Sequence, residues 1–133
     1  MIVLDTHALV WWVSDPRQIP ARARRLVQDA VGRSQQIAVS SISMWEIAQL
    51  VERGRLELAI DAETWLTAVQ SLPFLTFVPV DSAIAIRAVN LPDFPNRDPA
   101  DRFIVATALS LGATLITADR RMRGYDAVST VWD

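Results

Sequence analysis

Short apolar runs alternate along this chain with longer segments in which apolar residues recur at helical spacing. Five runs have the length and the β-branched content of buried strands: residues 2–4, 37–40, 75–80, 114–118 and 128–132. Helices are predicted in the segments that lie between them: residues 7–14, 20–30, 44–51, 61–72, 82–90 and 98–112. Strands that alternate with helices are typical of βαβ units, so the predicted fold class is α/β with a mostly parallel sheet.

The boundaries of these elements carry residues that begin and end helices. Asp61 and Asp81 stand where an N-cap is expected, and Asp98-Pro99 combines an N-cap with a proline at the first helical position. All four glycines fall at predicted helix ends. A length of 133 residues then predicts a single domain spanning residues 1–133.

The amino-acid composition excludes several classes of protein. Apolar residues make up 51% of the chain, which is enough for a substantial core. No stretch approaches the ~20 uncharged apolar residues of a membrane span, and the N-terminus lacks the basic segment of a signal peptide. The absence of cysteine excludes disulfides, thiolate metal sites and thiol catalysis, and it fits a cytoplasmic protein.

The charge balance excludes a wholly basic nucleic-acid binder, because the net charge is −2. All 13 basic residues are arginine, and there is no lysine. Arginine favours planar, bidentate partners such as phosphate. Compositional bias of the source explains the missing lysine more simply than a functional choice does.

Four acidic residues stand at element boundaries: Asp5, Glu46, Asp101 and Asp119. Two of them follow predicted strands, and the other two lie in the first turns of helices. In a parallel sheet the carboxyl end of a strand and the start of the next helix share one edge, where ligands bind. We therefore expect all four acids near one rim, with Thr6 and Thr117 in the same neighbourhood.

Converging carboxylates repel one another and resist desolvation, which proteins tolerate mainly where a divalent cation neutralises them. Oxygen ligands, with no cysteine and one histidine, suit Mg²⁺ or Mn²⁺ better than Zn²⁺. Such a cation completes its shell with water and substrate phosphate, and a bound water can act as the nucleophile. The pattern therefore indicates phosphodiester hydrolysis.

Structural interpretations of these acids stay open. Ser43 to Glu46 matches a capping box, so Glu46 could simply bond the Ser43 amide. Helix initiation alone explains Asp98 to Asp101, and Asp119 could cap the turn that follows it. Their common edge nevertheless favours a site. The single histidine, His7, is assigned a structural role.

The basic residues directly after Asp119 allow two interpretations. Arg120 and Arg121 would lie at the same rim, where they could contact substrate phosphates. The alternative is a solvated turn with no partner. The sequence does not separate the two.

Several ordered pieces of the chain resemble the PIN-domain ribonucleases, and within them the VapC-type toxins of type II toxin–antitoxin systems. They span nearly the whole sequence: Leu4 to Leu9 with Trp11-Trp12, Ser40-Ser41 through Trp45-Glu46-Ile47, Gly54-Arg55-Leu56, Arg97 to Arg102 with Ile104 to Ala108, and Leu115 to Asp119. Each piece alone is weakly specific. The complete set, in the family's order, is considerably more specific.

The resemblance implies a PIN-like three-layer α/β/α sandwich whose central sheet has about five strands, and a Mg²⁺- or Mn²⁺-dependent endoribonuclease. It places the catalytic and metal-binding acids on the four boundary positions: Asp5, Glu46, Asp101 and Asp119. Thr6 and Thr117 fall on positions that support the acids. Asp98 caps its helix and is a candidate for a residue that contacts the metal ligands without binding the metal itself. The implied partners are RNA, a cognate antitoxin and a second copy of the chain. The number of metal ions stays open.

Three other classes of protein deserve comparison. Phospho-receivers and haloacid-dehalogenase-like phosphatases depend on a lysine, which this chain lacks, and the latter favour Asp-x-Asp where this chain has Asp5-Thr6-His7. A non-catalytic binding module would not need four intact acids. A PIN nuclease that is not a toxin remains compatible with the sequence, as does any class of RNA target.

Overall fold

Five parallel strands form one sheet at the centre of the molecule, which we describe for residues 1–133 from a computed structural model. The strand order is β3-β2-β1-β4-β5, with β1 in the middle. The bounds are as follows: β1 Ile2–Leu4, β2 Ile37–Ser40, β3 Leu75–Val78, β4 Thr114–Ile116 and β5 Thr130–Val131. All four strand pairings are parallel, which confirms the predicted fold class.

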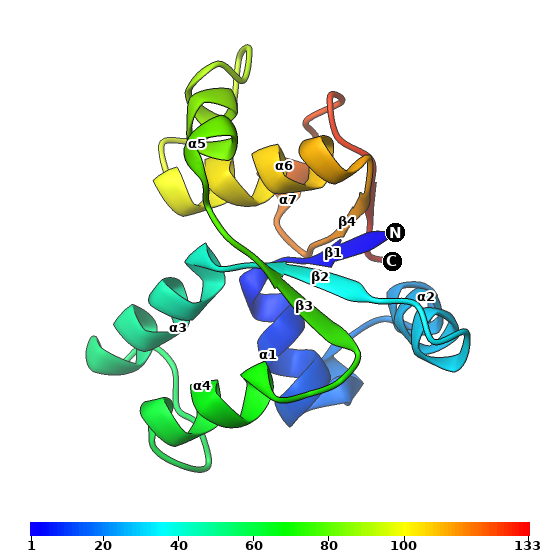
Figure 1. The fold of residues 1–133 in the computed structure, drawn as a ribbon, viewed down its shortest axis with the longest axis vertical. Helices are drawn as coiled ribbons and strands as arrows, with labels where there is room; N and C mark the ends of the chain where they lie inside the picture. The colour runs from blue at the N-terminus through cyan, green and yellow to red at the C-terminus, as the bar shows by residue number, and fades with distance from the viewer.

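Helices cover both faces of this sheet (Figure 1). Their bounds are as follows: α1 Thr6–Ser14, α2 Ala21–Gly32, α3 Ile42–Glu52, α4 Ala62–Gln70, α5 Ser82–Val89, α6 Pro99–Leu111 and α7 Arg120–Arg123, with a 3₁₀ turn at Pro16–Gln18. In Figure 1, α5, α6 and α7 lie on one side of the strands, and α1 and α4 lie on the other. The three-layer arrangement implied by the resemblance is therefore present. None of the helices is both long and apolar enough to cross a membrane.

Alternation along the central strand divides the core into two parts. Ile2 and Leu4 of β1 belong to the apolar cluster that includes residues of α1, α2 and α4. Val3 points to the opposite face and belongs to the cluster that includes Ile104 of α6 and Met122 of α7. Both faces of β1 are buried, so the strand carries no polar residue until Asp5.

Three predicted strands are shorter in the structure. The predicted strand 114–118 ends at Ile116, because its neighbour β1 has only three residues to pair with it. The predicted strand 75–80 ends at Val78, before Pro79, which has no amide hydrogen to donate to a ladder. The last strand is confined to Thr130–Val131.

Three helices also differ by two residues at one end. Helix α2 ends at Gly32, two residues after the predicted end. Helix α3 begins at Ile42, two residues before the predicted start, and α4 ends at Gln70, two residues before the predicted end. The predicted N-caps Asp61 and Asp81 are confirmed, since each side chain accepts a backbone N–H of its helix's first turn.

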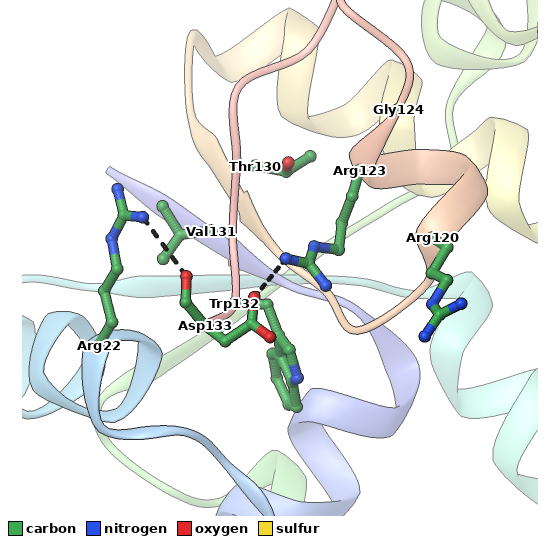
Figure 2. Close-up of a pocket in the computed structure, with 8 residues that line it drawn as sticks. All are labelled: Arg22, Arg120, Arg123, Gly124, Thr130, Val131, Trp132 and Asp133. Atoms are coloured by element: carbon green, nitrogen blue, oxygen red, sulfur yellow. Dashed lines mark hydrogen bonds and ion pairs between the residues drawn. The ribbon is translucent and has the colours of Figure 1, made fainter.

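The last strand joins helices from opposite ends of the chain. The carbonyl oxygen of Trp132 accepts the amide of Ala23 in α2, at 3.2 Å. Beyond it, the side chain of Asp133 forms an ion pair with Arg123 of α7, and its backbone oxygen accepts Nη1 of Arg22 at 3.4 Å (Figure 2). The end of β5 thus brings α2 and α7 together.

Candidate active site

The structure brings all four predicted acids to one cavity of about 380 Å³ at the carboxyl edge of the sheet. Eight residues line it: Asp5, His7, Trp11, Glu46, Asp98, Asp101, Ala118 and Asp119. The acids come from four separate parts of the chain, as the shared-edge prediction requires. We refer to this hollow as the acidic cavity.

Asp5 is the most deeply placed acid of the set, with 7% of its surface exposed. Its Oδ1 accepts the amide of Thr6 at 2.7 Å, which makes it the N-cap of α1. Its Oδ2 accepts the hydroxyl of Thr117, also at 2.7 Å. Burial raises the pKa of Asp5, and these two hydrogen bonds oppose the rise because they favour the ionised form.

Glu46 reaches the cavity from the second turn of α3, and the hydroxyl of Thr6 donates to its Oε1. The hydroxyls of Thr6 and Ser43 lie 2.9 Å apart, so Ser43 extends the same network. The capping-box interpretation is wrong, because the N-cap of α3 is Ser41 and Ser43 lies inside the helix. Burial raises the pKa of Glu46, and the negative charges of Asp5 and Asp98 raise it further.

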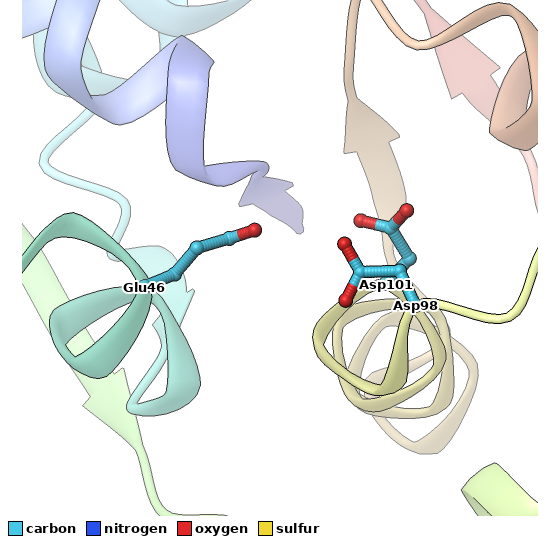
Figure 3. A group of neighbouring side chains, drawn as sticks. All are labelled: Glu46, Asp98 and Asp101. Atoms are coloured by element: carbon cyan, nitrogen blue, oxygen red, sulfur yellow. The ribbon is translucent and has the colours of Figure 1, made fainter. Parts of the chain in front are cut away.

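Asp101 faces Glu46 across the cavity, from the first turn of α6 (Figure 3). Burial raises its pKa to about 8, with further contributions from Asp5, Asp98, Asp119 and Glu46 in that order. A carboxyl group with this pKa keeps a proton for much of the time at neutral pH unless a cation takes its place.

Asp98 performs the predicted capping role and also faces the cavity. Its Oδ1 accepts the amide of Ala100 at 3.0 Å, which starts α6. Carboxylate oxygens of Glu46, Asp98 and Asp101 all lie within 4.8 Å of one another (Figure 3). The two interpretations of Asp98, cap and member of the acidic group, are therefore compatible.

Asp119 likewise has two roles, as a helix cap and as an acid of the cavity. Its Oδ1 accepts the amides of Arg121 and Met122 at 2.8 and 3.2 Å, which makes it the N-cap of the short helix α7. Its own amide donates to the hydroxyl of Thr117 at 3.0 Å. The capping interpretation is thus correct, and the same side chain lines the acidic cavity.

Neither of the two arginines proposed for phosphate contact lines the acidic cavity. Arg120 lines a second cavity, together with Arg22 and Arg123. Arg121 is exposed and lines neither cavity. The segment forms helix α7 and not the turn that was predicted, and contact of Arg121 with phosphate stays a prediction.

Asn96 is the residue that sequence reasoning missed. It is buried, its Nδ2 donates to Oδ2 of Asp101 at 2.9 Å, and its Oδ1 accepts the amide of Asp98 at 2.9 Å. It therefore orients two acids at once. It lies in a proline-containing loop without periodicity, so no sequence pattern marked it. His7, assigned a structural role above, is exposed and lines the acidic cavity.

The donor set of the acidic cavity fits a hard divalent cation. Five carboxylates line it, and no arginine pairs with any of them, since the two ion pairs of the molecule are Arg17–Asp15 and Arg123–Asp133. Burial is the main cause of the raised pKa values of Asp5, Glu46 and Asp101, and repulsion by neighbouring carboxylates adds to it. Mg²⁺ or Mn²⁺ would relieve this repulsion and accept oxygen ligands, as the sequence predicts.

Comparisons with known proteins agree with this architecture. A family model described as PIN domain matches residues 2–128. Ribonuclease VapC22 from Mycobacterium tuberculosis is 36% identical over 133 residues, which cover 98% of each chain.

Solved structures share the fold at lower identity. One is VapBC2 from Rickettsia felis bound to a DNA fragment from their promoter, with a TM-score of 0.71, 18% identity and full coverage of both chains. Another is a toxin–antitoxin complex from Klebsiella pneumoniae, with a TM-score of 0.62, 21% identity and coverage of 98% of this chain and 97% of the other.

Proposed function

We propose a function from the premise that this chain belongs to the PIN domain family: it is a metal-dependent endoribonuclease, and it is the toxin of a toxin–antitoxin pair. The observation that carries the chemistry is the convergence of five carboxylates on one cavity without a basic partner. The relative named as a ribonuclease, 36% identical over 98% of both chains, supports RNA as the substrate.

The proposed metal ligands are Asp5, Glu46, Asp101 and Asp119, with Asp98 beside them. A bound Mg²⁺ or Mn²⁺ would supply charge for the scissile phosphate and a water of lowered pKa. Asp101 would give up its proton on binding the cation, because metal and proton compete for the same carboxylate.

Hydrogen bonds from neighbouring side chains fix these carboxylates before substrate arrives. Thr117 and the Thr6 amide occupy both oxygens of Asp5, and Asn96 orients Asp101. The Thr6 hydroxyl holds Oε1 of Glu46 and leaves Oε2 to accept a proton from the attacking water. Water adds at phosphorus, one ester P–O bond breaks, and the departing oxygen takes a proton from solvent, to which Glu46 releases the proton that it accepted.

Cleavage of RNA with Mg²⁺, compared with the same reaction in EDTA, tests the proposed reaction. The variants Asp5→Asn and Asp101→Asn should lose at least about a hundredfold in rate, as ligand or electrostatic losses in active sites commonly do. Asp29→Asn is the matched control, since Asp29 is an exposed acid on α2. Absence of cleavage by the wild-type chain, or equal cleavage by the variants, would overturn the proposal.

The toxin role is tested in cells. Expression of the chain should arrest growth, expression of Asp101→Asn should not, and co-expression of the cognate antitoxin should restore growth. Cleavage in vitro without growth arrest would favour a PIN nuclease that is not a toxin. A map of new RNA 5′ ends after induction would identify the target.

The remaining proposals concern assembly and location. We expect a homodimer in solution, which light scattering can measure, and a cytoplasmic location, where the RNA and the antitoxin are made. The solved toxin–antitoxin complex of this fold supports an antitoxin as the protein partner.

A further inference from the structure

A second cavity, of about 350 Å³, carries charge opposite to that of the acidic cavity. Arg22 of α2 and Arg120 and Arg123 of α7 line it, with the end of β5 between them (Figure 2). We call it the arginine cavity. Asp133 forms an ion pair with Arg123, and its backbone oxygen accepts Arg22. The side chain of Arg120 forms no hydrogen bond or ion pair, so of the three guanidinium groups only that of Arg123 is paired with a carboxylate.

The two cavities are neighbours. Asp119 lines the acidic cavity, and the next residue, Arg120, lines the arginine cavity. Trp11 lines the first and Trp132 the second, and their ring centroids lie 5.7 Å apart. His7 continues this contact, with its ring centroid 5.7 Å from that of Trp11. A row of three aromatic rings therefore connects the metal-binding acids with the arginines.

Arginines beside aromatic rings match the chemistry of single-stranded nucleic acid. Guanidinium groups bind backbone phosphate in bidentate fashion, whereas bases stack on aromatic faces without strong sequence preference. His7 is exposed and Trp11 is half-buried, so both offer ring surface to a base. The arginine cavity alone would suit any anion, but its position next to the acids favours the continuation of the same strand.

We propose that the arginine cavity binds a backbone phosphate of the RNA next to the one that is cut. The strand runs from the acidic cavity past His7 and Trp11 to Arg22, Arg120 and Arg123. The phosphate takes the place of the Asp133 carboxylate on Arg123. This inference rests on the proposed function and assigns the path of its substrate.

Binding of a fluorescein-labelled single-stranded RNA of about 12 nucleotides, followed by anisotropy in EDTA, tests the path without cleavage. Arg22→Ala and Arg120→Ala should each weaken binding about tenfold, the equivalent of about 1.4 kcal/mol. Each should also reduce the slope of log K against log salt by about 0.7, as expected for one lost phosphate contact on a single strand. Arg25→Ala is the matched control, because Arg25 is an exposed arginine of α2 outside the cavity.

A variant that is expected to strengthen RNA binding distinguishes a lost phosphate contact from a general loss of structure. Asp133→Asn frees Arg123 and should tighten RNA binding about threefold. In cleavage assays, Arg22→Ala should raise KM for a long RNA and leave kcat unchanged. A dinucleotide, too short to reach the arginine cavity, should be cut equally by Arg22→Ala and wild type.

Two results would overturn the inference and leave the proposed nuclease intact. One is unchanged RNA affinity in Arg22→Ala and Arg120→Ala while the wild-type chain cleaves RNA. The other is weakened binding of the antitoxin but not of RNA, which would assign the cavity to an acidic protein segment. If the wild-type chain binds RNA through these arginines but never cleaves it, the nuclease proposal fails, and the placement of this phosphate beside a cleaved one fails with it.

Discussion

The hydroxyl of Thr117 donates to Oδ2 of Asp5 at 2.7 Å, across 112 positions of sequence. The same hydroxyl oxygen accepts the amide of Asp119 at 3.0 Å. One fully buried threonine thus fixes the positions of two proposed metal ligands, one from each end of the chain. The arrangement of the acids depends on this contact as much as on the acids themselves.

Replacing Thr117 by valine keeps the side-chain shape and removes the hydroxyl. We expect Thr117→Val to destabilise the protein by about 2 kcal/mol, because a buried carboxylate oxygen loses a charge-assisted hydrogen bond. Urea denaturation measures this loss, and the pKa of Asp5 should rise further. Thr67→Val, at an exposed position on α4, is the control and should change stability by less than about 0.5 kcal/mol. Equal losses in both variants would refute the role assigned to the hydroxyl.

The raised pKa of Asp101 predicts that the metal-free protein loses stability as the pH rises. The pKa of Asp101 is 3.8 in the unfolded chain and about 8 in the folded chain. Between these two pH values the unfolded chain has released a proton that the folded chain retains, so rising pH favours unfolding. Asp5 and Glu46 have pKa values raised in the same direction. Melting temperatures in EDTA should therefore fall between pH 5 and pH 8.

Asp101→Asn should flatten that pH profile. Because Asp101 is only partly buried, solvent screening limits the gain in stability at pH 8 to about 1 kcal/mol. This corresponds to a rise of about 3 °C in the melting temperature for a chain of this size. Asp29→Asn should leave the profile unchanged. A variant that melts below wild type at pH 8 without metal would contradict the electrostatic explanation.

Binding of a divalent cation should offset the loss of stability that results from placing several acids close together. At a Mg²⁺ concentration about a hundred times its Kd, binding should stabilise the folded wild-type chain by about 2.7 kcal/mol. Thermal melts at pH 8 measure the shift, which should shrink at pH 6 because protons compete with the metal. Asp5→Asn should lose most of the shift, whereas Asp29→Asn keeps it. An unchanged melting temperature at every Mg²⁺ concentration would exclude a metal site in the acidic cavity.

Asn96 offers a test at a residue that touches the acids and binds no metal in the proposal. Asn96→Asp replaces the amide donor to Asp101 with a further carboxylate. We expect Mg²⁺ affinity to fall about 10- to 100-fold, the usual effect of losing a group that orients a ligand. Asn90→Asp, on the exposed end of α5, is the control. If metal titrations give equal affinities for the two variants, Asn96 does not orient Asp101.

Much of the fold is encoded locally and could be predicted. Asp61, Asp81 and Asp98 cap helices because their side chains bond amides two or three residues away, a relationship visible in the sequence itself. The resemblance also implies that the strand at residues 2–4 lies at the centre of the sheet, and the strand order confirms this. Apolar runs without charge identified strands that are buried on both faces.

The parts that could not be predicted depend on distant contacts. Helix α3 starts at Ile42, two residues earlier than predicted, so Glu46 lies in its second turn, where it bonds Thr6, 40 positions away. Asn96 reaches Asp101 only because the loop before α6 folds back on its helix. The length of β4 follows from the length of its neighbour β1, not from its own residues.

The central position of β1 also sets the order in which the acidic cavity can be completed during synthesis. A nascent chain that ends before β4 has β1 at an open edge of the sheet, since β4 is its partner on that side. Asp5 then lacks the hydroxyl of Thr117, and Asp119 is not yet made. A ribosome that translates this chain therefore carries no assembled cavity until residue 119 has been added. If the cavity is the nuclease site that we propose, the nascent chain cannot cleave RNA before that point.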